Sequence, residues 1–284
     1  ELIWSGSYSY GGEDVSAFLA NSVSLTTPGG AFSVAPEPGG STLGTKGPNG
    51  TCATDPTTPP APVEPCFYVR WADVTTQVSA AGSGSYQVGG VPGTQADTPG
   101  NASETGNNTG WTLAVVYENP SLPARNLTLF VGDALTNSTR STPVTIDGFC
   151  TPPSGPVSGR LLISASEGDA NRVGDQLQFG RLATSLVPVQ GPNNPINNFF
   201  GSQINDATGL LDTAGTFGTR NHSSSSGASV SGGRQGWDIT SVDVTAQLAN
   251  SQRSAVTRGT STGDQYVINA LATQIDIGAP LFPP

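Results

Sequence analysis

The chain has no methionine, one lysine, one histidine and few charged residues of either sign. Only 11% of its 284 residues are charged, and no apolar run approaches the length that spans a membrane. The single lysine, Lys46, leaves no basic patch, so nucleic acid is not expected as a partner. The single histidine, His222, lies in a polar stretch without a nucleophile-elbow or zinc-site pattern. These absences predict a non-enzymatic protein with no direct membrane span.

The absence of methionine extends to position 1, which predicts that processing made the N-terminus. Residues 1–4 resemble neither a signal peptide nor a membrane span, so we expect a secretory signal to have been removed. A net charge of −10 suits an exported protein that stays soluble through its charge. The sequence therefore predicts a secreted, extracellular protein at the cell surface.

The residues that are abundant favour β structure. The chain contains 37 glycines and 23 prolines, and Thr, Ser and Asn are frequent between short apolar alternations. Such a composition is typical of many short strands with turn-rich connections. We expect two tandem antiparallel β-sandwiches of jelly-roll type with long Gly/Pro/Ser/Thr/Asn-rich loops, and helix confined to short turns.

A repeated element supports this duplication. The pattern Asp-Val-Thr-x-Gln-(Val/Leu) occurs at residues 73–78 and 243–248, where Asp73 and Asp243 are placed to N-cap a helical turn. Other segments correspond in the same order: residues 2–7 with 162–166, and the continuously apolar 111–117, typical of a central strand, with 266–272. Such order predicts tandem domains.

The boundary between these domains is expected in the Pro-rich stretch 150–156. The first domain would be the acidic residues 1–149, and the second, related domain would be residues 150–284.

The three cysteines indicate an oxidising compartment. A disulfide between Cys52 and Cys66 would pin the ends of a Pro/Thr-rich loop, and we favour it over Cys66–Cys150. Connectivity cannot be derived from the sequence alone. Cys150 would then be free, and we interpret it as a small buried hydrophobe beside Phe149.

Three carboxylates form a candidate metal site. Glu167, Asp169 and Asp175 lie around tight Gly-containing turns, and a hard cation such as calcium could gather their oxygens. The alternative is that Asp and Gly here only form turns.

Two further groups of residues concern carbohydrate. Six asparagines meet the Asn-x-Ser/Thr rule for glycosylation: Asn49, Asn101, Asn107, Asn126, Asn137 and Asn221. Tyr8 and Tyr10 are the aromatic residues expected to be exposed, and they could stack on sugar rings.

Several short motifs carry a resemblance. They are Trp4-Ser5-Gly6-Ser7, Trp71-Ala72-Asp73-Val74-Thr75, residues 110–118, Glu167-Gly168-Asp169, Gly174-Asp175, Gly236-Trp237-Asp238 and Gly263-Asp264. Their order resembles a module of large secreted cell-surface proteins of bacteria and archaea. The Asp-Val-Thr elements also resemble those of jelly-roll, galactose-binding-like domains. The resemblance implies an exported β protein at the cell surface and carries no catalytic residues over.

The leading hypothesis is a structural subunit of a surface assembly or filament, joined head to tail to copies of itself. Residues 1–4 enter a strand without a lead-in, which predicts an unpaired edge in the first sandwich. Leu2 and Trp4 would form this end, and Leu281 and Phe282 in the tail would meet it. The alternative is an adhesin that binds surface glycans through Tyr8 and Tyr10.

Overall fold

The structure is a computed structural model that describes residues 1–8, 15–43, 66–93, 108–170, 172–214, 234 and 236–277. The first strands are β1 (Leu2–Tyr8), β2 (Val23–Thr27), β3 (Gly30–Val34), β4 (Ser41–Leu43), β5 (Cys66–Ala72), β6 (Gln87–Gly89) and β7 (Asn108–Leu113). The others are β8 (Arg125–Thr136), β9 (Val144–Asp147), β10 (Gly159–Ser166), β11 (Gln176–Gly180), β12 (Val187–Pro188), β13 (Trp237–Asp243), β14 (Ser254–Thr260) and β15 (Tyr266–Asp276).

Helix is confined to short turns, as predicted. The described helical segments are α1 (Thr75–Ala81) and the 3₁₀ turns η1 (Ser16–Phe18) and η3 (Thr245–Gln247). The all-β, antiparallel fold class is therefore confirmed. No described helix is long and apolar enough to cross a membrane.

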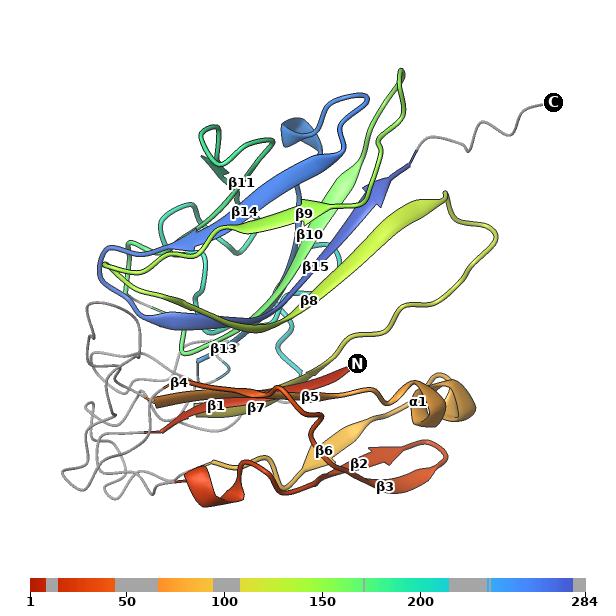
Figure 1. The fold of residues 1–284 in the computed structure, drawn as a ribbon, viewed down its shortest axis with the longest axis vertical. Coiled ribbons are helices and arrows are strands. Elements are labelled where there is room, and N and C mark those ends of the chain that lie inside the picture. The colour runs from red at the N-terminus through yellow and green to blue at the C-terminus, as the bar shows by residue number, and fades with distance from the viewer. Residues whose placement is uncertain are drawn as a thin grey trace.

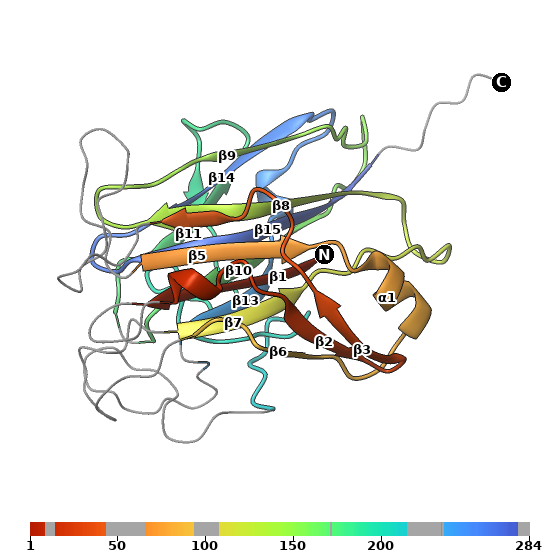
Figure 2. The same ribbon diagram turned by 60° about the horizontal axis from the view of Figure 1, so that its bottom comes forward.

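The strands form four sheets that stack face to face (Figure 1). We number them in stacking order: sheet I is β3-β2-β6, sheet II is β4-β5-β1-β7, sheet III is β13-β10-β15-β8 and sheet IV is β12-β11-β14-β9. All strand pairs within these sheets are antiparallel. Figure 2 shows strands β5, β1 and β7 of sheet II running in roughly the same direction as β8 and β15 of sheet III.

Three apolar layers fill the spaces between the four sheets. Leu2, Trp4 and Tyr68 belong to the cluster between sheets I and II, and Leu161 and Phe179 to the one between sheets III and IV. The middle layer lies between sheets II and III and contains Ile3, Phe67, Val69, Leu135 and Val267. Because layers lie on both sides of sheet II, every residue of its central strand β1 is buried. The two sheet pairs therefore share a core where two separate tandem sandwiches were expected.

The strand registers show how the two halves correspond. Leu2 pairs with Ala72, the residue before Asp73, and Leu161 pairs with Val242, the residue before Asp243. Leu2 thus matches Leu161, one residue earlier than the sequence comparison placed it. On the other side of β1, β7 pairs Leu113 with Leu2. On the other side of β10, β15 pairs Thr273 with Leu161.

That second pairing corrects another alignment. Counting back from Leu113 and Thr273, Trp111 matches Leu271, whereas the sequence comparison had matched it to Tyr266. The error arose because both segments are apolar and alternation alone does not fix a register.

The division between the halves also differs from the prediction. β8 pairs with β15, and β9 pairs with β14, so residues 125–147 belong to sheets III and IV. The chain leaves the first sheet pair through residues 114–124, well before the Pro-rich stretch at 150–156.

The two Asp-Val-Thr elements occupy equivalent places, each directly after the strand that pairs with β1 or β10. Asp73 Oδ1 accepts the Thr75 N–H at 2.8 Å, and Asp243 Oδ1 accepts the Thr245 N–H at 2.7 Å. The N-cap position itself is the following valine in both cases, so each aspartate stands one residue earlier than predicted. These valines, Val74 and Val244, are buried and anchor the turns to the apolar layers.

Two predictions about individual side chains are wrong. Leu2 and Trp4 are fully buried in the centre of sheet II, between β5 and β7, so they cannot form an exposed end for assembly. Cys150 is an exposed free cysteine, although Phe149 and Thr151 on either side of it are buried.

A substitution in the middle layer tests whether the sheet pairs depend on each other. Phe67→Ala should lower the free energy of unfolding by about 3–5 kcal/mol, because it leaves a cavity between sheets II and III. Phe18→Ala is the matched control, since that side chain is 53% exposed, and it should change stability by no more than about 0.5 kcal/mol. Urea unfolding followed by tryptophan fluorescence measures both; equal effects would show that the middle layer contributes little.

Candidate functional site

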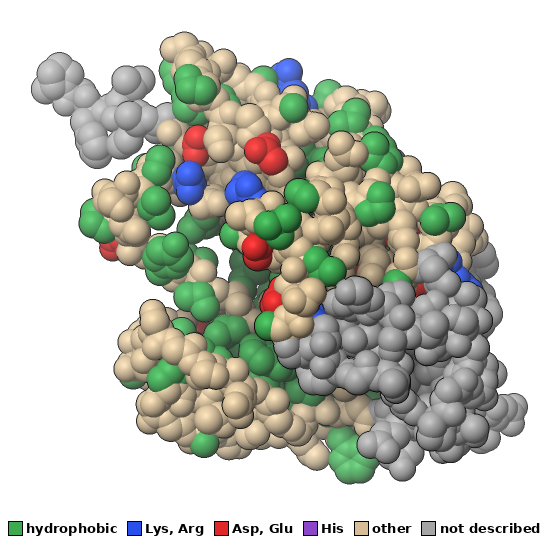
Figure 3. Space-filling model, turned by 180° about the vertical axis from the view of Figure 1, so that it is seen from behind, with side chains coloured by type: hydrophobic (Ala, Val, Ile, Leu, Met, Phe, Trp, Pro, Cys, Tyr) green, Lys and Arg blue, Asp and Glu red, His purple; other side chains and the backbone are tan. Residues whose placement is uncertain are grey.

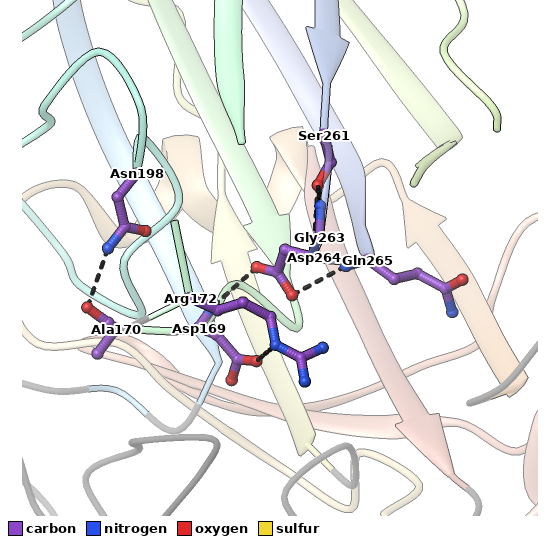
Figure 4. Close-up of polar contacts among 8 residues, drawn as sticks. All are labelled: Asp169, Ala170, Arg172, Asn198, Ser261, Gly263, Asp264 and Gln265. Atoms are coloured by element: carbon purple, nitrogen blue, oxygen red, sulfur yellow. Dashed lines mark hydrogen bonds and ion pairs between the residues drawn. The ribbon is translucent and has the colours of Figure 1, made fainter. Parts of the chain in front are cut away.

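Three turns and the start of β13 meet at one end of sheets III and IV. Together they bring five acidic residues into contact range, and we call Glu167, Asp169, Asp175, Asp238 and Asp264 the carboxyl cluster. All but Glu167 are at most 3% exposed. Figure 4 shows Asp169 and Asp264 facing each other across two of these turns.

Glycines allow the turns to approach this closely. A Cβ on Gly168 would lie 2.6 Å from the carbonyl oxygen of Phe200 and would also meet the Asp238 carboxylate. Gly174 has φ +119°, a conformation that other residues rarely adopt, and its Cα faces the Thr262 side chain. The Gly-Asp pattern therefore places a carboxylate immediately after a point where two backbones touch.

Asp264 joins two of the turns. Its Oδ2 accepts the Asp169 N–H at 3.3 Å, and its Oδ1 accepts the Gln265 N–H at 2.8 Å (Figure 4). The Ser261 hydroxyl oxygen accepts the N–H groups of Gly263 and Asp264 and so closes the turn before β15.

Asp175 and Asp238 hold the long loop after β12. Asp175 Oδ2 accepts the Phe200 N–H at 2.7 Å, and Asp238 Oδ1 accepts the Gln203 N–H at 3.0 Å. The remaining oxygens, Asp175 Oδ1 and Asp238 Oδ2, are buried without a hydrogen-bond partner. Each of these carboxyls thus has one oxygen bonded to a loop and one facing the interior.

Burial raises the pKa of most of these groups. The pKa of Asp175 rises to about 6, mainly because burial penalises its charged form. The pKa of Asp264 rises to about 8 through burial and the negative charges of Asp169 and Asp175. Burial likewise raises the pKa of Glu167 and of Asp238 well above their usual values. The cluster therefore holds protons at pH values where exposed carboxyls have lost them.

Within the described residues, Arg172 forms an ion pair with the cluster. Arg172 Nε lies 3.7 Å from Asp169 Oδ2, but the Arg172 side chain is 53% exposed, so water screens this pair (Figure 4). Nearby, Asn198 donates to the Ala170 carbonyl at 3.0 Å. The raised pKa values of Asp175 and Asp264 let these carboxyls hold protons, which limits the repulsion between buried negative charges.

The three predicted calcium ligands lie near one another but are not arranged to hold a metal ion. Glu167, Asp169 and Asp175 do lie in one cluster, as the sequence predicted. Within the residues that the structure describes, however, no three His, Cys, Asp or Glu side chains are arranged to hold a metal ion. Instead, Asp175 binds backbone N–H groups, which is the turn-forming role given as the alternative.

Sequence reasoning missed two members of the cluster. Asp238 and Asp264 stood in the motifs Gly-Trp-Asp and Gly-Asp but were not grouped with the other three. The signal was present, because Asp169, Asp175 and Asp264 each follow a glycine directly. Their proximity depends on pairing between distant strands, which spacing along the chain does not reveal.

The predicted carbohydrate-stacking residues are not exposed as expected. Tyr8 is fully buried at the end of β1, within the layer between sheets I and II, because that strand lies in the middle of its sheet. Tyr10 lies outside the described residues.

Four glycosylation candidates, Asn49, Asn101, Asn107 and Asn221, also lie outside the described residues. The other two use their side-chain nitrogens within the fold. Asn126 Nδ2 donates to the Gly148 carbonyl at 3.3 Å, and Asn137 Nδ2 donates to Gln265 at 3.1 Å.

Other predicted sites remain predictions. Cys66 is buried at the start of β5, while Cys52, Leu281 and Phe282 lie outside the described residues.

Comparisons with known proteins name no family. No protein-family model matches the chain, and no curated protein matches it. A solved structure of the infectious bursal disease virus Gx strain is similar to 99% of this chain at 9% identity and a TM-score of 0.24. This chain covers 57% of that viral chain. A likeness this weak supports no functional argument.

The carboxyl cluster predicts an unusual dependence of stability on pH. Folding raises these pKa values, so the folded state binds more protons than the unfolded state, and stability falls as pH rises from the unfolded pKa near 4 through the folded values near 6 and 8. We expect the melting temperature to fall by about 5 °C or more between about pH 5 and about pH 8.5. Asp264→Asn should flatten this dependence, and Asp147→Asn, at an exposed site, should leave it unchanged.

Differential scanning calorimetry across this pH range gives the measurement. A melting temperature that stays constant or rises with pH would contradict the protonated cluster. Added calcium that restores the lost stability near pH 8.5 in the native chain, but not in Asp169→Asn, would instead support the predicted calcium site.

Proposed function

We propose that this protein is a non-enzymatic structural subunit of an extracellular surface assembly. The observation that carries this proposal is the shared middle layer. Two related sheet pairs are joined through the apolar faces of sheets II and III, by residues such as Phe67 and Val267. Repeats that bury a common face against a neighbour form continuous, stiff arrays.

The polar features of the described residues support the same role. The carboxylates of the carboxyl cluster receive backbone N–H groups and fasten loops to sheets III and IV. Arg160 likewise connects to Ser241 on the neighbouring strand and to the Ala207 carbonyl in the long loop. Polar groups used in this way stabilise shape, which a structural subunit requires.

The resemblance to modules of bacterial and archaeal cell-surface proteins agrees with this role, as do the low charge content and net charge of −10. We accordingly place the protein outside the cell, with copies of itself as partners. Assembly through Leu2 and Trp4 is withdrawn, since both are buried. The adhesin alternative is weakened in the same way, because Tyr8 is part of the core.

Size-exclusion chromatography with light scattering, followed by negative-stain electron microscopy, tests the proposal on the purified chain. We expect concentration-dependent oligomers that appear as elongated or regular particles. A monomer at every concentration would contradict the structural role, and saturable binding on a glycan array would then favour the adhesin.

A further inference from the structure

Two strands of the second half have no counterpart in the described part of the first half. Strands β5-β1-β7 of sheet II match β13-β10-β15 of sheet III, but sheet III continues with β8 beyond β15. Strands β3-β2-β6 of sheet I match β12-β11-β14 of sheet IV, but sheet IV continues with β9 beyond β14. Within the described residues, the outer edges of β7 and β6 are therefore open at adjacent positions.

The opposite edges do not show this difference. β4 lies beside β5 in sheet II, and a bridge at Ile204 lies beside Ile239 of β13 in sheet III. Sheets II and III are thus both extended on that side, and β3 and β12 end sheets I and IV alike, so within the described residues the halves differ at the edges of β7 and β6.

The register shows what the missing strand changes. Ile275 stands two residues after Thr273 and is fully buried, and it pairs with Asn126 of β8. Its counterpart, two residues after Leu113, is Val115, which is 52% exposed. β15 continues to Asp276 beside β8, whereas β7 ends at Leu113.

The exposed continuation of β7 is strongly apolar. Val116 and Tyr117 are each 69% exposed, and no charged residue or proline occurs between residues 108 and 117 or within β6. Soluble proteins usually protect sheet edges with charges, prolines or bulges. Residues 111–117 instead have the sequence of a central strand and lie at an edge.

Figure 3 shows the molecule hollowed between the two sheet pairs, with hydrophobic side chains lining the hollow. Several Lys/Arg and Asp/Glu side chains lie above and beside this hollow on the same face. Exposed apolar surface of this kind marks interaction sites.

We propose that the outer edges of β7 and β6 accept a pair of strands of the β8–β9 type, supplied by a neighbouring module of the same kind. The first strand would extend sheet II beside residues 108–117 and bury Val115, as β8 buries Ile275. The second would extend sheet I beside β6, as β9 extends sheet IV beside β14. Backbone hydrogen bonds supply the affinity in such strand addition, and the apolar side chains supply the register.

This inference adds detail to the proposed structural role. The strand-accepting edge is argued from the fold alone, and only the identity of the donor rests on the proposed function. A further strand pair of this type, contributed by a neighbouring module, would join the two modules through sheets I and II. The unpaired edge predicted from the sequence therefore lies at β7 and β6, away from the buried strand β1.

The test supplies the strand pair within the full chain. A copy of residues 125–159, with Cys150→Ser in the copy, is fused before residue 1, because Glu1 matches Arg160 in the register. Hydrogen exchange in residues 109–117 should slow by about tenfold or more, since their outward amides gain partners. The melting temperature should rise as well.

The matched control carries Leu129→Pro and Val131→Pro in the added copy only, because proline cannot complete the ladder. This control should exchange like the native chain. Unchanged exchange in residues 109–117 with the intact extension, together with unchanged exchange in β15, would overturn the proposal. If the extension protects β7 but the native chain never oligomerises, the edge of β7 does accept a strand pair. That result would contradict only the proposed assembly role.

Discussion

The burial of sheets II and III on both faces is the constraint on which the rest of the structure depends. Each of these sheets lies between two apolar layers, so side chains on both faces of its central strands are withdrawn from water. β1 shows this directly, because all seven of its residues are buried. The middle layer of Ile3, Phe67, Val69 and Val267 then makes one stack from two related halves. Hydrogen bonds between Ser5 and Ser166 and between Thr112 and Ser164 also join the two sheets, and other polar contacts fasten the loops.

The carboxyl cluster shows how loops are fastened in a chain with few cations. Loops that return to the ends of sheets III and IV present backbone N–H groups that need acceptors. Asp175, Asp238 and Asp264 supply these acceptors, but their burial places several negative charges close together. The raised pKa values follow from this arrangement, and protons replace the cations that the composition lacks. The same hydrogen bonds make the loops part of the rigid body.

Composition and alternation were sufficient to predict an antiparallel all-β fold, and the repeated Asp-Val-Thr element correctly identified equivalent strands. They could not give the partners of each strand. Residues 125–147 were assigned to the first domain by their position in the sequence, yet they pair with β14 and β15. Tyr8 was taken as exposed because polar residues flank it, but the middle of a covered sheet buries both faces. The carboxylates at 167, 169 and 175 were found because they are near in sequence, and Asp238 and Asp264 were missed because they are not.

Two features of the fold are locally unfavourable: the buried carboxyl cluster and the exposed apolar edge of β7. Different physical changes can relieve each of them. Buried carboxyls are unfavourable when charged, and the cluster can relieve this internally by holding protons. Among the described residues, β7 has no strand on its outer side. Its outward amides need a partner strand or water, and Val115, Val116 and Tyr117 are exposed and need an apolar neighbour. The second half shows the arrangement that satisfies both needs, with β8 beside β15. Because the two halves share a register, the same solution fits the first half, and only the source of the strands differs. The proposed neighbour at β7 would therefore do for this edge what protons do for the carboxyl cluster, which is to make local sequence and overall fold agree.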